Sequence, residues 1–117
     1  MSIKTSKFTE VDTEGFGTAT STAGAASTAT QSSVVTTEAL ATAAGATYTF
    51  TLTNQLINAN SVVIAVVGKG TATTGGLTPI FTTPAAGSAV VIFQNVTAAA
   101  LNGTTKIFFF IHNLCLS

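Results

Sequence analysis

The sequence has very little charge. Of its 117 residues, 7% are charged, against roughly 25% in ordinary globular proteins. The chain contains no arginine and its formal net charge is zero, so it lacks both the basic patch that neutralises phosphates and the bidentate guanine contact of nucleic-acid readers. We therefore expect no nucleic-acid partner.

Cysteine, tryptophan and tyrosine are also scarce. Cys115 is the single cysteine, which excludes a disulfide within the chain and a cysteine-based zinc site. Its leucine neighbours indicate a small buried hydrophobe, with a free thiol near the C-terminus as the alternative. There is no tryptophan and one tyrosine, Tyr48, so aromatic platforms for stacking sugars are sparse.

No apolar run approaches the roughly 20 residues of a membrane-spanning helix. The first residues, MSIKTSKFTEV, contain no apolar core of a secretory signal. We therefore expect no membrane partner, and synthesis and assembly inside a cell.

The catalytic inventory is too small to favour an enzyme. His112 is the only group with an ordinary pKa near neutrality, and Glu38 is the only carboxylate after Glu14. A nucleophile pair of His112 and Cys115 can be drawn, but residues three apart on a strand point to opposite faces. We expect no catalysis and no cofactor or metal.

A short glycine-rich segment, GKGT at 68–71, superficially resembles a phosphate-binding loop. That motif needs Ser or Thr directly after the lysine, but Gly70 follows Lys69 here. It also needs a glycine five residues before the glycine that precedes the lysine, and this chain has Val63 at that position. No helix is expected to follow that could hold a phosphate at its N-terminus. The segment is better explained as a flexible loop.

Threonine, serine, alanine and glycine take the place of charge. Between residues 47 and 53 threonine alternates strictly with Tyr48, Phe50 and Leu52, which is the period of a strand with one wet face. The run 62–67 is apolar at every position, so we expect apolar neighbours on both of its faces, either a second sheet or another protein chain.

The whole pattern predicts an all-β fold, a single small β-sandwich or jelly roll of about eight antiparallel strands with an extended N-terminal arm. The arm covers residues 1–16 and the sandwich domain residues 17–117. The strands are expected near 18–23, 26–30, 33–37, 47–53, 61–67, 77–82, 88–96 and 106–112. Glycine and proline turns separate them, and no segment has the apolar period of a substantial helix.

The last expected strand, KIFFFIH at 106–112, is apolar on both faces. A domain this small can bury one face in its own core, which leaves the other for a second sheet edge or a neighbouring subunit. The alternative is a self-contained core that holds both faces. We take the interface candidates from the arm and from this strand: Ile3, Phe8, Val11, Phe16, Phe108 and Phe110.

A longer succession of motifs is similar to a module of tailed-bacteriophage structural proteins. It comprises VVTTEALATAAGATYTFTLTN at 34–54, SVVIAVV at 61–67, AAGSAVVIFQNVT at 85–97 and an apolar final strand. Those β-modules have a threonine-rich strand, then "LAAGA", "FTLTN", an apolar strand, a glycine-rich loop, "AAGS" and "N-V-T". The resemblance covers about 80 residues, and the charged arm before Gly15 and the aromatic run at 107–111 depart from it.

The resemblance implies a virion protein made in the host cytoplasm. Such modules serve as capsid decoration (cement) proteins and as parts of fibres, often as trimers. We therefore expect a homo-oligomer, with a trimer favoured, that binds the major capsid protein or another virion protein through apolar β contacts and the arm. A phage fibre or receptor-binding module, contacting a cell surface through Tyr48 or the 68–76 loop, is the alternative, and a small enzyme is a third, disfavoured one.

Overall fold

Strands supply the regular structure of residues 16–113, the part of the chain that the computed structural model describes. They are β1 (Phe16–Thr20), β2 (Ala25–Ser27), β3 (Ser32–Thr36), β4 (Thr47–Thr53), β5 (Val62–Lys69), β6 (Leu77–Ala85), β7 (Ser88–Asn95) and β8 (Thr105–His112). No helix occurs among these residues. The predicted all-β class is confirmed, and each expected strand is present with its ends within three residues of the predicted ones.

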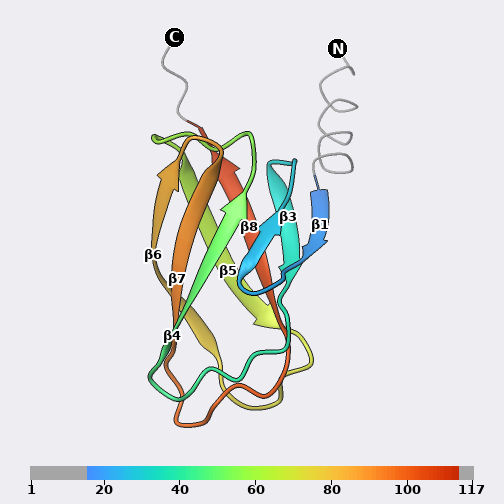
Figure 1. Cartoon of the computed structure of the whole chain (residues 1–117), viewed down its shortest axis with the longest axis vertical. Coiled ribbons are helices and arrows are strands. Elements are labelled where there is room, and N and C mark those ends of the chain that lie inside the picture. The colour runs from blue at the N-terminus through green and yellow to red at the C-terminus, as the bar shows by residue number, and fades with distance from the viewer. Residues whose placement is uncertain (1–15, 114–117) are drawn as a thin grey trace, which may run out of the picture.

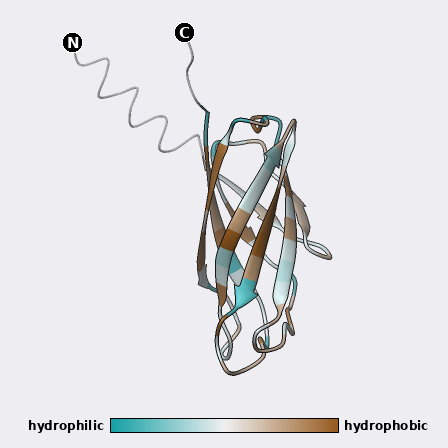
Figure 2. Cartoon of the chain, turned by 90° about the vertical axis from the view of Figure 1, so that its left-hand side faces the viewer, coloured by the Kyte–Doolittle hydropathy of each residue, from teal (hydrophilic) through white to brown (hydrophobic). Residues whose placement is uncertain are grey.

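The strands form two four-stranded sheets that pack face to face (Figure 1). One, which we call sheet A, has the order β1-β3-β8-β5, and the other, sheet B, has the order β2-β4-β7-β6. The molecule is therefore a small β-sandwich. In Figure 2 hydrophobic and polar bands alternate along the strands that face the viewer, as expected when each strand has one buried face.

The pairing is not antiparallel throughout, contrary to the expectation. β1 pairs with β3, and β2 with β4, in parallel, whereas the other four pairings are antiparallel. The reason is the path of the chain, which alternates between the sheets from β1 to β4. Each crossing reverses direction, so the strand that returns to a sheet runs parallel to the one that left it.

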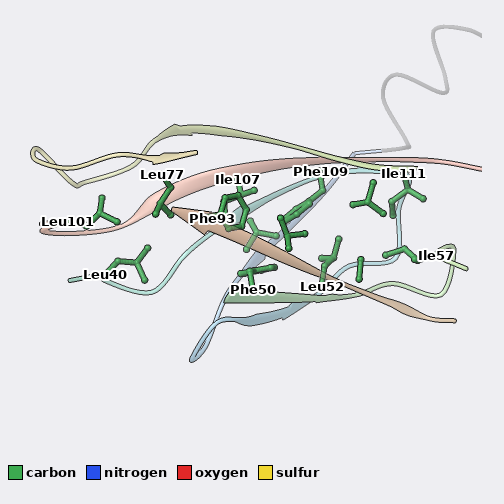
Figure 3. Packing of buried hydrophobic residues seen from close by; sticks show 14 of the residues in the cluster. Leu40, Phe50, Leu52, Ile57, Leu77, Phe93, Leu101, Ile107, Phe109 and Ile111 are labelled. Atoms are coloured by element: carbon green, nitrogen blue, oxygen red, sulfur yellow. The ribbon is translucent and has the colours of Figure 1, made fainter. Parts of the chain in front are cut away.

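The core lies between the sheets and is built from one face of each long strand (Figure 3). Phe50 of β4 and Phe109 of β8 stack across the sandwich, with ring centroids 5.4 Å apart. Tyr48 lies beside them, and its ring centroid is 6.2 Å from that of Phe93 of β7. The threonines that alternate with Phe50 and Leu52 point away from the core, so the predicted faces of this strand are confirmed.

Two buried asparagines hold the loops that leave the core strands. The side chain of Asn95, at the end of β7, donates to the carbonyls of Thr42 (3.0 Å) and Ala99 (2.8 Å) and accepts from Thr97 N–H (3.0 Å). Asn54 follows β4 and donates to the carbonyl of Thr30 at 2.8 Å. Both are fully buried, and their bonds satisfy backbone groups that no strand pairs.

Candidate interaction surface

The outer face of sheet A carries a continuous apolar surface across its last two strands. Val62, Ile64 and Val66 of β5 are 45%, 49% and 50% exposed, and Phe110 of β8 is 44% exposed. The register places Ile64 directly opposite Phe110, and Val66 opposite Phe108. We call these five side chains, with Val34 of β3 beside Phe108, the sheet A patch.

Alternation within the two strands produces this surface. In β8, Ile107, Phe109 and Ile111 fill the core, so the residues between them must point outward. In β5, Val63 is buried and Val62 and Ile64 on either side of it are exposed. The predicted division of the last strand into two apolar faces is confirmed, and a self-contained core holding both faces is not what the described residues form.

Phe108 is half-buried because its ring lies over a glycine. A Cβ placed on Gly68 would come within 2.7 Å of the Phe108 ring. The ring thus packs on the backbone of Gly68, in the space that a side chain at position 68 would fill. Phe108 therefore forms the packed rim of the sheet A patch, and Phe110 stands out as its most exposed aromatic residue.

The other predicted interface residues fall in or next to the undescribed N-terminus. Ile3, Phe8 and Val11 lie outside the described residues. Phe16 begins β1, and the register places its Cα in one row with Ser32 and Phe110. Phe16 is therefore the first residue of a strand in the sheet that carries the patch, and not the last residue of the arm as expected. A role of these residues in an interface stays a prediction.

Sheet B also exposes apolar side chains, but over a less uniform surface. Phe81 and Ile80 of β6 are 55% and 48% exposed, beside a bulge between Pro79 and Phe81. The adjoining strands present Ile92 and then the threonines of β4. This face is therefore mixed, whereas the sheet A patch is apolar over two adjacent strands.

Sequence reasoning missed a polar cluster around Glu38. The hydroxyl of Ser21 donates to one carboxylate oxygen, and that of Tyr48 to the other at 3.1 Å. Burial raises the pKa of Glu38, but hydrogen bonds from Ser21, the backbone and Tyr48 outweigh it, so the pKa lies below the usual value of 4.5. Burial, partly offset by Ser21 and reinforced by the charge of Glu38, raises the pKa of Tyr48 to about 12.

The cluster ties three separate segments of the chain together by hydrogen bonds. It joins the β1–β2 connection, the segment after β3 and strand β4. Its one carboxylate is held ionised by hydroxyl donors, and a tyrosine with a raised pKa keeps its proton at neutral pH. No pattern of spacing links residues 21, 38 and 48, so only the fold could reveal it.

The structure describes only one of the two remaining candidate residues, His112 and Cys115. His112 is exposed at the end of β8, and Cys115 lies outside the described residues. Within residues 16–113 no three His, Cys, Asp or Glu side chains come together as a metal site would require. Nor does that part of the chain contain a helix of the length and hydropathy needed to cross a membrane.

The glycine-rich segment after β5 lines a depression of about 330 Å³ together with Leu77 and Thr105. It is tied down rather than loose, contrary to the expectation of a flexible loop. Thr71 N–H bonds to the Thr104 hydroxyl at 2.9 Å, and the Asn102 side chain accepts from the N–H groups of Thr73 (2.7 Å) and Thr74 (3.0 Å). Gly70 and Gly75 leave room for this close approach.

No protein-family model matches the chain, and comparison with characterised proteins and with solved structures also gives no match.

Proposed function

We propose that the chain is a structural virion protein, and most directly a capsid decoration protein that adheres through the sheet A patch and the N-terminal arm. The observation that carries the proposal is the patch itself. Four of its apolar side chains, on two adjacent strands, are roughly half exposed among the described residues, and the partly buried Phe108 and Val34 extend the surface to a third strand. Large contiguous apolar surfaces of this kind mark sites of protein association.

The energetics support a contact repeated by symmetry. Complete burial of a Val, Ile or Phe side chain contributes about 1.5–3 kcal/mol, and four members of the patch are still roughly half exposed. Covering them would contribute roughly 3–6 kcal/mol per copy before the entropic costs of association. That is weak for one contact and strong for many copies acting on one lattice.

The neutral composition supports the same proposal. A net charge of zero gives separate copies little electrostatic protection against association. The bacteriophage resemblance would supply the setting, a virion with the major capsid protein or another virion protein as partner. Modules of the kind it resembles are often trimers, so we favour a trimer. Adhesion is the chemistry in this proposal, with no enzymatic step, cofactor or nucleic acid.

A fibre or receptor-binding module is the second candidate, favoured by the depression beside Gly68–Gly76. Tyr48, the other residue considered for that role, lies half-buried with its hydroxyl on Glu38, so its ring is not offered to a ligand. The depression is lined by one lysine, Lys69, and two threonines, Thr73 and Thr105, which could contact a polar ligand. Three polar side chains are few for a specific ligand site, so the depression is a weaker basis for function than the patch.

Two experiments on purified particles test the proposal. Quantitative mass spectrometry should find hundreds of copies per particle for a shell component, whereas a handful would mean a fibre or tail part. Particles assembled with a chain lacking residues 2–14 should lose the protein while the released chain stays folded. Full occupancy by the truncated chain would refute the role of the arm.

A further inference from the structure

The far edge of β5 is unlike the other three sheet edges of this molecule. β1 and β2 are edges of five and three residues. β6 is interrupted by Pro79, Pro84 and a bulge, which are devices that prevent strands from adding to an edge. β5 has eight residues with neither proline nor bulge, and its one charge, Lys69, is at the end.

One hydrogen bond of the neighbouring strand β8 shows in which direction the N–H and C=O groups of β5 point. Ile111 N–H donates to the carbonyl of Gln31 at 2.9 Å, on the β3 side of β8. Backbone groups alternate between the two sides of a strand, so Phe108, Phe110 and His112 bond toward β5. By the register, their partners are Val66, Ile64 and Val62.

The residues between these partners therefore point their N–H and C=O groups away from β8. They are Val63, Ala65 and Val67, and among residues 16–113 no strand pairs with that edge. Unpaired edge groups favour the addition of another strand. The side chains of these three residues face the core side, so a strand that paired here would disturb no packing of the outer surface.

We propose that β5 pairs antiparallel with β5 of a second copy of this chain, about a two-fold axis through Ala65. Val63 then pairs with Val67 of the second copy and Ala65 with its own equivalent, each pair exchanging both N–H···O bonds. Ile64 lies opposite Val66 of the second copy on the outer face. The two sheet A patches join into one apolar surface across the dimer.

The sequence of β5 fits a second copy better than a foreign strand. The strand has no charge from Val62 to Gly68, so nothing repels an identical neighbour. Antiparallel pairing about Ala65 sends the two Lys69 side chains to opposite ends of the contact. A two-fold contact is also self-complementary, because the same residues meet on both sides.

Substitution of Ala65 by proline tests the pairing without removing a bond to β8. The N–H of Ala65 faces the open edge, which is where a strand tolerates proline. We expect Ala65→Pro to keep its circular-dichroism spectrum and to lose the two-fold contact in light scattering. Persistence of that contact in a folded Ala65→Pro chain would overturn the proposal.

Amide hydrogen exchange on the unmodified full chain gives a test that needs no variant. In the assembled protein the amides of Val63, Ala65 and Val67 should exchange at least tenfold more slowly than the same amides of any monomeric fraction. Equal exchange in both states, or a chain that is monomeric or purely trimeric, would refute a two-fold pairing. Loss of protection on deletion of residues 2–14 would assign the edge to the arm instead.

A two-fold contact joins copies in pairs, so this pairing does not build the trimer favoured above and would instead link one trimer to another. It is also independent of adhesion to a particle, and the two can fail separately. Phe110→Lys changes the outer face and leaves the β5 edge intact, so it should abolish particle binding and keep the β5 protection. Ala65→Pro should do the reverse. A variant pattern in which both properties always disappear together would refute the separate edge contact.

Discussion

Ile64 of β5 and Phe110 of β8 are directly opposite each other in the sheet A ladder, and both side chains point out of the sandwich. Cross-strand neighbours of this kind normally stabilise a sheet by packing against each other under a cover. Here each is almost half exposed. The pair lies at the centre of the sheet A patch, and several expectations depend on it.

Adjacent phenylalanines on β8 should respond very differently to truncation. Phe109 is fully buried and stacks on Phe50, whereas Phe110 points outward. Phe109→Ala should lower the free energy of unfolding by about 3–5 kcal/mol through the cavity it leaves. Phe110→Ala should lower it by less than about 1 kcal/mol when measured on the monomeric state, because exposed sites contribute little. Urea unfolding measures both, and similar losses would contradict the assignment of the two faces.

Asn95 should contribute strongly to the free energy of unfolding, although it is a polar residue. Asn95→Ala would remove three hydrogen bonds of a fully buried side chain, to the carbonyls of Thr42 and Ala99 and from the N–H of Thr97, and each such bond contributes about 0.5–1.5 kcal/mol. We expect a loss of about 2–4 kcal/mol in urea unfolding. Asn102→Ala is the matched control, since Asn102 makes comparable loop bonds at an exposed site. A larger loss for Asn102→Ala would contradict this account of the two loops.

Two glycines with the same backbone conformation should differ in their tolerance of alanine. Gly24 and Gly87 have φ angles of 79° and 82°, where a Cβ costs roughly 1–2 kcal/mol. A Cβ on Gly24 would also come within 2.8 Å of the Thr49 carbonyl, while one on Gly87 meets nothing within 4 Å. Gly24→Ala should therefore lower the melting temperature clearly more than Gly87→Ala. Equal shifts would show that the β1–β2 turn adapts freely.

Tyr48 should make stability fall at high pH. Burial raises its pKa from 10.0 to about 12, so the folded protein holds the phenolic proton more tightly than the unfolded chain does. This contribution is complete below pH 10 and is lost as the pH rises toward 12. The urea midpoint should decline over that window in the wild type and less steeply in Tyr48→Phe. The same decline in both proteins would assign it to other groups.

The strands could be predicted from the sequence because alternation and turn residues both act locally. The threonine alternation of 47–53 and the apolar run 62–67 each correspond to a strand, β4 and β5. The parallel pairing of β1 with β3 could not be predicted, since it depends on which sheet the chain enters after each turn. The burial of Asn95 and its bonds to two loops could not be predicted either, because the sequence does not show which loops pack over this residue.

The candidate surface was predictable in part. Two apolar faces on residues 106–112 indicated that one would lack cover, and Phe110 was correctly placed on the face opposite the core. The all-apolar run of β5 gave no clue to which of its residues point outward. That assignment needs the register with β8, which joins Ile64 to Phe110.

The most direct test of the central claim is sedimentation velocity of the full-length chain at micromolar concentration. The claim is that the exposed apolar β-surface exists to be covered by other protein. It predicts a folded species that sediments well above the 11.7 kDa of one chain and shifts with concentration. A single folded monomer throughout the concentration range would contradict it.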